Sequence, residues 1–384
     1  MIDADVVIAG AGCAGLSLAA QLSWLGHRGR VVLLDPRPTP ALDRTWCHFL
    51  GAPHPYERCI ARTWDRWRML GAGNVVERGS RARPYVHIST ERFVETSLEA
   101  CAKAGHEVRF GSHVVELDAR RDHVRVETSE GVISARLVID ARGARRSDTA
   151  VRDVSWVQHF VGWEVRTESP IFEPDVVTLM DLEVSQEAGP HFVYVLPFAR
   201  DHALVEDTYF GEEPLDEEVY TDTLERWLDE HGAGAFEILR VERGVIPMST
   251  APTAPSSSPR IVPLGIAGGS AKASTGYAFQ FIQRHAAEVA RAIATGGDPP
   301  RIPPARSHVA SFYDRVFLSY LRRHRREAPS LFTDMFDRTP PDVLARFLSE
   351  EASALDHLAV MNSVPRLRVT AEVLRSSPLW LRSR

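Results

Sequence analysis

The first 35 residues carry the pattern that most constrains how this chain can fold. A short apolar run, Val6–Ala9, leads into three closely spaced glycines, Gly10, Gly12 and Gly15, which are followed by small residues. A second apolar run ends in an acidic residue, Asp35, about 20 positions after the last glycine. This order predicts a strand, a glycine turn, a helix and a second parallel strand, which together form the dinucleotide-binding βαβ unit.

Each element of this unit has its own physical role. Gly10 is expected to make the tight turn, Gly12 to let the backbone approach a pyrophosphate, and Gly15 to let helix and strand pack closely. The pyrophosphate would lie at the helix N-terminus, where free N–H groups and the helix dipole favour an anion. Asp35 is expected to bind the ribose hydroxyls. A small-residue turn in an ordinary α/β protein is the alternative.

Length and composition restrict the other possibilities. The 384 residues suggest two domains, or one large domain with an appendage. A net charge of −6 gives no reason to expect nucleic acid as a partner. Four scattered cysteines, without ligand spacing to histidine, predict a reduced, cytoplasmic protein with no metal site. The glycine pattern leaves no room for a signal peptide, and no apolar run is long enough to span a membrane.

Two segments near the first unit hold further candidates for cofactor binding. Arg44 and Trp46 follow the second strand and are placed to touch the dinucleotide or to line a cavity, although a surface loop anchored by Trp46 explains them equally well. The alternating segment 106–139 predicts an antiparallel meander that feeds a buried strand. This strand ends at Asp140 and Gly143, which could contact the cofactor or mark a plain exit into a loop.

The second half of the chain contains a different pattern. Residues 156–243 form a series of apolar and aromatic runs with one charged helix, which predicts an antiparallel sheet with one face free to cover a cavity. A flexible loop is expected at 251–259. A strand, a glycine-rich loop and a helix from 279 to 294 then return to the first unit. Three residues of this loop are expected to face the cofactor: Gly268, Thr275 and Gly276.

Two adjacent carboxylates, Glu206 and Asp207, interrupt an otherwise apolar, aromatic strand. Burial raises the pKa of a carboxyl group, so such a residue can hold a proton at neutral pH and act as an acid on an apolar substrate. Salt bridges to arginines are the structural alternative. Successive side chains of a strand face opposite ways, so only one of the two can point into a given cavity.

Several motifs resemble those of bacterial lycopene β-cyclases, and the resemblance spans nearly the whole chain. The matching segments are Asp43-Arg-Thr-Trp46, Val138-Ile-Asp-Ala-Arg-Gly143, Met180-Asp-Leu-Glu-Val-Ser-Gln186, Phe192-Val-Tyr-Val-Leu-Pro197, Leu204-Val-Glu-Asp-Thr-Tyr209, Thr275-Gly-Tyr277, Arg346-Phe-Leu348 and Val360-Met-Asn-Ser-Val-Pro365. The chain departs from the family at Gly269, where flavoproteins often have an aspartate, and at Lys272-Ala273, where His-Pro is common. These departures affect the expected flavin contacts.

The resemblance implies an activity and its cofactors. The family binds FAD, works with the reduced flavin, with NAD(P)H as the reductant, and cyclises the acyclic ends of lycopene to β-ionone rings without net redox change. It also implies that Glu206 is the acid/base, while Asp207 acts or orients the site. The aromatic residues Trp46, Tyr209 and Tyr277 could stabilise a cation through their negative ring faces.

The same resemblance implies the domain organisation. We expect a mixed α/β fold with a discontinuous Rossmann-type FAD-binding domain (1–70, 90–150 and 245–300), a substrate-binding β-sheet domain (71–89 and 151–244) and a C-terminal helical region (301–384). Because lycopene lies in the bilayer, a peripheral contact with the inner face of the membrane is expected. Its candidate residues are Phe312, Phe317, Tyr320, Leu321, Phe332, Met335 and Phe336 beside the basic run 322–326. Ordinary helix packing explains them equally well.

Two other functions remain compatible with the sequence. A flavin monooxygenase or polyprenyl reductase would use the same scaffold for net redox chemistry. A non-catalytic carotenoid- or flavin-binding protein would need no buried acid, so the Glu206–Asp207 pair argues against it. The sequence leaves open the natural polyene, the ring type, the oligomeric state and whether one or both ends are cyclised.

Overall fold

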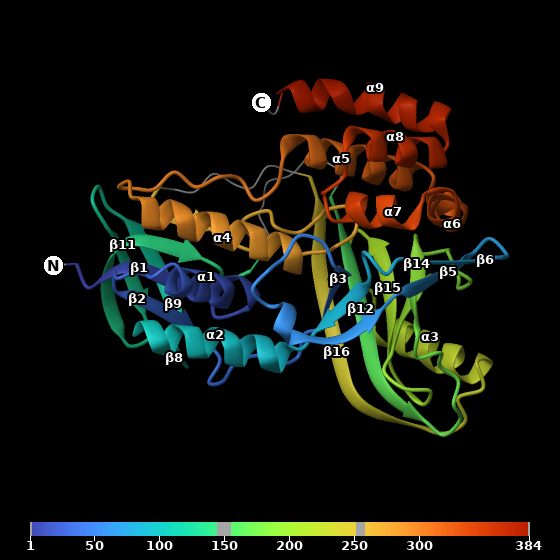
Figure 1. Ribbon diagram of the computed structural model, residues 1–384, viewed down its shortest axis with the longest axis horizontal. Helices are drawn as coiled ribbons and strands as arrows, with labels where there is room; N and C mark the ends of the chain where they lie inside the picture. The colour runs from blue at the N-terminus through green and yellow to red at the C-terminus, as the bar shows by residue number, and fades with distance from the viewer. Residues whose placement is uncertain (1, 144–154, 251–257, 383–384) are drawn as a thin grey trace.

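The computed structural model describes residues 2–143, 155–250 and 258–382. Two large sheets and a smaller third one lie side by side, and helices of the C-terminal region lie over the second large sheet (Figure 1). The predicted mixed α/β class is confirmed. The predicted loop at 251–259 falls mostly outside the described residues.

The first sheet is built around the predicted βαβ unit. Its strands follow the order β8-β2-β1-β11-β10-β9, and β17 pairs with β11. The strands are β1 (Ala4–Ala9), β2 (Val31–Asp35), β8 (Glu107–Phe110), β9 (Val114–Ala119), β10 (Val124–Thr128), β11 (Gly131–Asp140) and β17 (Ile261–Pro263). Pairing is parallel among β8, β2, β1, β11 and β17, and antiparallel from β9 to β11.

Three helices cover this sheet: α1 (Cys13–Trp24), α2 (Thr90–Ala104) and α4 (Phe279–Thr295) (Figure 1). They bury one face of β1 and β2, and the other face packs against residues of β9, β10 and β11. Because both faces are buried, both strands read as continuous apolar runs. The predicted ends of α2 are confirmed, since the side chain of Ser89 caps its first turn and Gly105 ends it with φ 72°. The predicted return of β17 and α4 to this sheet is also confirmed.

One part of the predicted meander is wrong. The segment around Val108 forms β8 and pairs in parallel with β2, with Val108 opposite Leu33. The reason is that α2 acts as a crossover helix and returns the chain to the sheet beside β2. The antiparallel meander therefore consists of β9, β10 and β11 alone.

The second sheet follows the order β16-β12-β15-β14-β13-β5-β6. Its strands are β5 (Arg66–Gly71), β6 (Asn74–Gly79), β12 (Ser155–Thr167), β13 (Val176–Asp181), β14 (His191–Pro197), β15 (His202–Gly211) and β16 (Phe236–Ser249). Helix α3 (Glu217–Glu230) packs on one face. Residues 66–70, expected with the first domain, pair with β13 in this sheet. The wider division into domains stays a prediction.

The remaining elements connect these sheets to the C-terminal region. A small sheet contains β3 (Trp46–Phe49), β4 (Ile60–Trp64) and β7 (Tyr85–Ile88), with a short 3-10 helix η1 (Glu57–Cys59) beside it. The helices that follow are α5 (His308–Arg323), η2 (Arg325–Glu327), α6 (Ala328–Arg338), α7 (Pro341–Leu348), α8 (Ala354–Ser363) and α9 (Arg366–Arg382). The predicted helical C-terminal region is thus confirmed. Among the helices that the structure describes, none is long and apolar enough to cross a membrane.

Candidate active site

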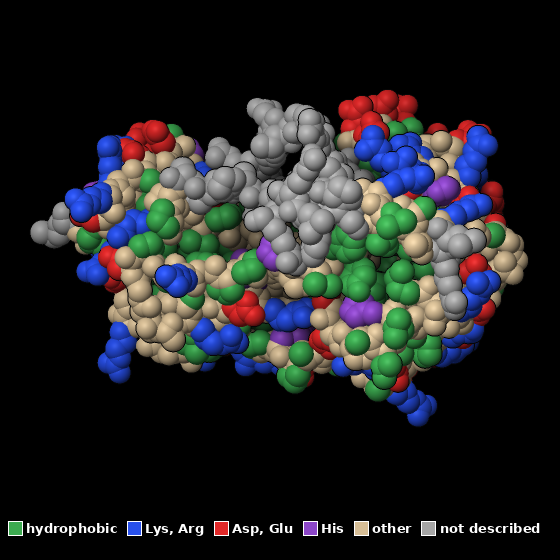
Figure 2. Space-filling model, turned by 90° about the horizontal axis from the view of Figure 1, so that it is seen from above, with side chains coloured by type: hydrophobic (Ala, Val, Ile, Leu, Met, Phe, Trp, Pro, Cys, Tyr) green, Lys and Arg blue, Asp and Glu red, His purple; other side chains and the backbone are tan. Residues whose placement is uncertain are grey.

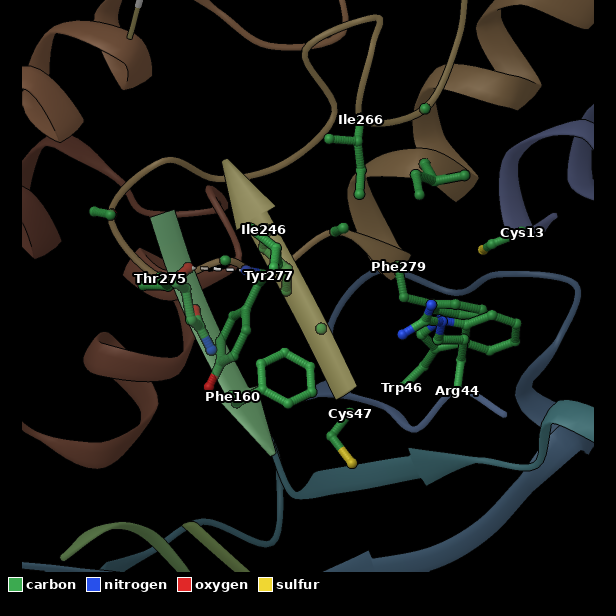
Figure 3. A pocket seen from close by; sticks show the side chains of 18 of the residues that line it. Cys13, Arg44, Trp46, Cys47, Phe160, Ile246, Ile266, Thr275, Tyr277 and Phe279 are labelled. Atoms are coloured by element: carbon green, nitrogen blue, oxygen red, sulfur yellow. Dashed lines mark hydrogen bonds between the residues drawn. The ribbon is translucent and has the colours of Figure 1, made fainter. Parts of the chain in front are cut away.

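A continuous cavity of about 810 Å³ runs from the glycine turn after β1, past the second sheet, to the C-terminal helices. Figure 3 shows its middle, where Phe160 and Tyr277 lie together above Cys47, while Trp46, Arg44 and Phe279 form a second group on the side of Cys13. The cavity therefore has three parts: a dinucleotide end, a central chamber and an apolar end.

The glycines at the dinucleotide end differ in what surrounds them. A Cβ atom at Gly10 would lie 2.7 Å from the carbonyl oxygen of Ala141, and one at Gly15 would lie 1.9 Å from the oxygen of Gly10. These two positions are closed by the protein itself. A Cβ at Gly12 would meet nothing within 4 Å, and Gly12 lines the cavity at the N-terminus of α1. An open backbone at a helix N-terminus is what a pyrophosphate needs.

The acidic and basic candidates at this end are partly engaged by neighbours. Asp35 lines the cavity, where its carboxylate accepts from the backbone N–H of Ala11 at 2.7 Å and pairs with Arg37 at 2.8 Å. Arg44 also lines the cavity and donates to the carbonyl of Arg243 at 2.6 Å. Trp46 stacks on Phe279 with ring centroids 5.4 Å apart (Figure 3).

The other predicted cofactor residues divide into two sets. Gly143, Thr275 and Gly276 line the cavity. Asp140 does not, and its carboxylate pairs with Arg142 at 2.7 Å. Gly268 also lies outside the cavity wall, since a Cβ there would be 2.6 Å from the carbonyl of Pro263. Neither residue lines the cavity, and direct contact of either one with a cofactor stays a prediction.

These residues fit a dinucleotide cofactor such as FAD. Gly12 offers the open backbone, Asp35 a carboxylate at the end of β2, and Arg44 a cation at the wall. The side-chain oxygen of Gln158, a residue that lines the same cavity, is buried and has no hydrogen-bond partner. A Cβ at Gly276 would lie 2.2 Å from that oxygen, so the loop before α4 approaches it closely. Which residues contact the cofactor stays a prediction.

Glu206 lies in the central chamber, only 8% exposed. It is in the middle of β15, opposite Gly162 of β12 and Tyr194 of β14. The hydroxyl of Thr208 donates to its Oε1 at 2.9 Å. Burial, with the nearby charge of Glu242, raises the pKa of Glu206 to about 8. The carboxyl group is therefore protonated at neutral pH, as an acid catalyst requires.

Asp207 and Tyr209 lie on the other face of the same sheet, as strand geometry demands for Asp207. Asp207 is fully buried beside His191, whose Nε2 is 2.5 Å from its Oδ1. Tyr209 stacks on His191 at 3.8 Å and packs among residues under α3. Neither lines the cavity, so the structure does not place Tyr209 in the predicted substrate cavity, and Asp207, whose role the sequence left open between acting and orienting the site, contacts His191 instead. Period-two alternation from Glu206 puts Thr208, not Tyr209, on the chamber face.

Several chamber residues were missed by sequence reasoning. The hydroxyl of Tyr194 donates to that of Tyr85 at 3.1 Å, and the rings of Tyr85 and Tyr277 are 6.4 Å apart. Burial raises the pKa of Tyr277 to about 12, so its phenol stays neutral. Phe160 adds another ring, and a Cβ at Gly244 would collide with it at 2.2 Å. Alternation in the long strands could have suggested Phe160 and Tyr194, but Tyr85 comes from a separate sheet.

The apolar end of the cavity is formed by the C-terminal helices. Many residues expected at a membrane surface line the cavity here instead, with buried or half-buried side chains: Phe317, Tyr320, Phe332, Met335 and Phe336. Leu321 is fully buried as well. The proposed interfacial patch is therefore wrong for these residues, because α5 and α6 turn their apolar faces toward the second sheet.

The chain is similar to known proteins along almost its whole length. The family model described as "Lycopene cyclase protein" matches residues 5–373. The chain is 29% identical to a lycopene beta-cyclase from Paracoccus sp. over 94% of each chain, and 29% identical to one from Pantoea ananas over 64% of this chain and 62% of that one.

Solved structures with the same fold include a flavoprotein/dehydrogenase and a halogenase in complex with FAD. A geranylgeranyl bacteriochlorophyll reductase-like protein from Thermoplasma acidophilum superposes with a TM-score of 0.67 and 14% identity, covering 98% of this chain and all of that one. A halogenase PltM variant in complex with FAD gives a TM-score of 0.56 at 14% identity, covering 96% of this chain and 85% of that one. At such identity the likeness concerns the fold alone. By the family match across almost its whole length, the chain belongs to the lycopene cyclase family.

Proposed function

We propose that this protein is a lycopene β-cyclase that closes the acyclic ends of lycopene into β-ionone rings with no net redox change. The observation that carries the proposal is the position of Glu206, a buried and protonated carboxyl group in a chamber of aromatic side chains. That chamber opens on one side to a dinucleotide cradle and on the other to an apolar channel. An acid that is shielded from water and lies between a cofactor site and an apolar site is well placed to protonate a polyene.

The reaction needs a proton donor and an acceptor. Glu206 delivers its proton to the terminal double bond of the polyene, which leaves a tertiary cation. The neighbouring double bond attacks this cation and closes a six-membered ring, and loss of a proton restores the alkene. The product is an isomer of the substrate, because one proton is added and one is removed. Glu206 could accept the departing proton and return to its starting state.

The chamber residues supply what the cation needs. The rings of Phe160, Tyr194 and Tyr277 line the cavity and present electron-rich faces to positive charge. Their bulk excludes water, which would otherwise trap the cation as an alcohol. When bound, a reduced FAD would add negative charge near this point, with NAD(P)H as the source of its electrons. Residues at the Gly12 turn, Asp35 and Arg44 would hold it.

The substrate also has to leave the membrane to reach this chamber. The apolar end of the cavity is formed by helices α5 to α9, and several of their large apolar side chains are exposed: Val309, Leu355, Leu358 and Leu374. Figure 2 shows hydrophobic side chains gathered over the half of the molecule that carries these helices. A peripheral contact of this face with the inner surface of the membrane would place the apolar end of the cavity near the bilayer.

The test is expression in a lycopene-producing host, followed by product analysis. Wild-type protein should convert lycopene to cyclised carotenoids. Glu206→Gln removes the proton but keeps the shape, so conversion should fall by roughly a hundredfold or more. Glu187→Gln, at an exposed glutamate, is the matched control and should behave as wild type. Near-normal conversion by a folded Glu206→Gln variant would exclude Glu206 as the acid.

The same assay separates the alternatives. The solved structures that share this fold include a reductase-like protein and p-nitrophenol 4-monooxygenase, so net redox chemistry is possible on the scaffold. A monooxygenase or polyprenyl reductase would consume nicotinamide in proportion to product, whereas a cyclase would need only enough to reduce its flavin once. A carotenoid-binding protein would give no new product at all.

A further inference from the structure

A second carboxylate lies in the same cross-strand row as Glu206. Gly162 of β12 is in register with Glu206 of β15 on one side and with Glu242 of β16 on the other. Residues directly opposite each other point to the same face of a sheet. Both glutamates accordingly line the cavity. With neighbouring strands about 4.8 Å apart, their Cα atoms are about 10 Å apart, which two glutamate side chains can largely bridge.

The residue between the two carboxylates has no side chain. A Cβ at Gly162 would lie 3.3 Å from the Cβ of Glu206 and 3.3 Å from Leu204 Cδ1. Any larger residue there would fill the space that separates the glutamates. Glycine within a strand often marks a place where other groups must approach closely. Here the residue that lies between Glu206 and Glu242 in the cross-strand row adds no side chain of its own.

The side chain of Glu242 is held in place by hydrogen bonds. It is only 4% exposed, yet its carboxylate accepts from the backbone N–H of Thr45 at 3.0 Å and from the Thr45 hydroxyl at 2.6 Å. Arg240 donates to it at 3.2 Å. Arg240 also pairs with Glu164 at 3.0 Å, so one guanidinium serves two carboxylates. The charge of Glu242 is therefore only partly offset.

The other ionisable groups around Glu206 are on the far face of the sheet, are paired with other residues or are neutral. Asp207 lies on the opposite face beside His191, and Glu164 is bound by both Arg240 and His202. Arg44 is at the cavity wall but pairs with Asp43 at 3.8 Å. The remaining neighbours are groups that burial keeps neutral: Cys47, Tyr85, Tyr194 and Tyr277.

We propose that Glu242 is a positioning residue of the reaction, whose fixed negative charge beside Gly162 keeps the proton on Glu206 until the substrate takes it. The proposal rests on the proposed role of Glu206 as the acid. Glu242 acts through Glu206, and Thr45 and Arg240 hold it in place. Removing Glu242 and removing Arg240 should shift the pKa of Glu206 in opposite directions, because a nearby anion favours the protonated form of an acid and a nearby cation disfavours it. Removing Glu242 makes Glu206 give up its proton at lower pH, and removing Arg240 has the reverse effect.

The first measurement needs no substrate. Infrared spectroscopy detects the C=O stretch of a protonated carboxyl group, and the band of Glu206 is the one absent from Glu206→Gln. Its midpoint is followed as the pH is raised in wild type, Glu242→Gln, Arg240→Gln and the control Glu237→Gln, an exposed glutamate on the same strand. We expect the midpoint to fall by about one pH unit in Glu242→Gln, to rise in Arg240→Gln and to stay unchanged in the control.

The second measurement is the pH dependence of cyclisation. Activity should be lost about one pH unit earlier in Glu242→Gln, which means roughly tenfold less activity on the alkaline side and little change on the acid side. Glu242→Asp keeps the charge and should restore most of the wild-type profile. An unchanged infrared midpoint in Glu242→Gln would overturn the inference. If that variant fails to fold, a lower or unchanged midpoint in Arg240→Gln would overturn it instead.

The two proposals fail in different ways. If wild-type protein does not cyclise lycopene, the proposed function is wrong, while the infrared midpoints still decide whether Glu242 controls the proton on Glu206. If cyclisation occurs and the midpoints do not move, only the role of Glu242 is wrong.

Discussion

Glu206 and Asp207 are neighbours in sequence, but they occupy opposite environments. Glu206 faces an apolar chamber with one hydroxyl donor, and burial raises its pKa to about 8. Asp207 faces the far side of the sheet, where His191 offsets part of the cost of burying it. The alternation of the strand therefore gives the two carboxyl groups different roles. Glu206 can act as an acid on a substrate, whereas Asp207 forms a buried pair with His191 that supports the sheet.

The raised pKa of Glu206 has a consequence for stability. In the folded protein this group keeps its proton up to about pH 8, whereas in the unfolded chain it releases the proton near its ordinary pKa of 4.5. Between these values the folded state binds more protons, so its stability falls as the pH rises. Glu206→Gln removes this effect. We expect the melting temperature of the variant, relative to wild type, to increase between about pH 5 and about pH 8, as measured by thermal unfolding. A constant difference would contradict the raised pKa.

The Asp207–His191 pair is expected to be structural. Asp207→Asn leaves His191 with a weaker partner in a fully buried place, and losing a buried hydrogen-bond partner costs about 1–3 kcal/mol of folding stability. The variant should therefore melt well below wild type. Cyclisation per folded molecule should stay within about tenfold, because Asp207 does not line the cavity. A stable variant with no activity would place Asp207 in the chemistry after all.

Among the elements, the glycine turn after β1 contains one glycine that folding requires, Gly15, and one that cofactor binding is expected to require, Gly12. A side chain at Gly15 would collide with the backbone of Gly10, whereas a side chain at Gly12 would enter open space in the cavity. We expect Gly12→Leu to fold and to lose bound flavin, and Gly15→Leu to fold poorly. Flavin absorbance of the purified protein and its circular dichroism measure the two effects. Flavin retained at wild-type level by Gly12→Leu would argue against this cradle.

An ion-pair network connects the loop before α4 to Asp314 of α5. Lys272, which departs from the family pattern, is buried and contacts Asp314 at 3.1 Å, and Asp314 also accepts from Ser274 and pairs with Arg306. Lys272 does not line the cavity, whereas Ser274 and Thr275 do. The departure thus affects how the loop is anchored to α5, and the cavity-facing residues of the loop remain available to a cofactor.

At the scale of the whole molecule, the cavity connects the first sheet, the second sheet and the C-terminal helices. It ends beneath helices that carry exposed apolar side chains. Leu355 and Leu358 of α8 are 77% and 61% exposed, while Val360 and Met361 of the same helix line the cavity. This helix therefore connects the surface to the apolar end. A lipid surface is the partner that such a face would suit.

Substituting both exposed leucines tests this contact. Leu355→Ser with Leu358→Ser should weaken sedimentation with liposomes and slow the conversion of liposome-embedded lycopene by about tenfold. Conversion of detergent-solubilised lycopene should be unchanged. The matched control is Val115→Ser with Val132→Ser, two exposed valines of the first sheet. Equal liposome binding by both double variants would show that α8 is not the contact.

Much of the fold could be predicted because its signals are local. The βαβ unit, the caps of α2 and the meander from β9 to β11 each depend on residues close in sequence. The placement of β8 could not be predicted, since it depends on where α2 returns the chain. The aromatic residues of α5 and α6 were equally ambiguous, because an apolar helix face looks the same whether it covers a membrane or a cavity.

The sequence by itself determined the dinucleotide cradle and the presence of a carboxyl acid in an apolar strand. Glycine spacing and strand alternation are set by backbone geometry, which acts over a few residues. Only the tertiary structure decided that Glu206 faces the chamber, that Asp207 and Tyr209 do not, and that Glu242 stands in the same row. The reason is strand register. Glu206 of β15 and Glu242 of β16 come into one row because both are paired with Gly162 of β12, the strand that lies between them.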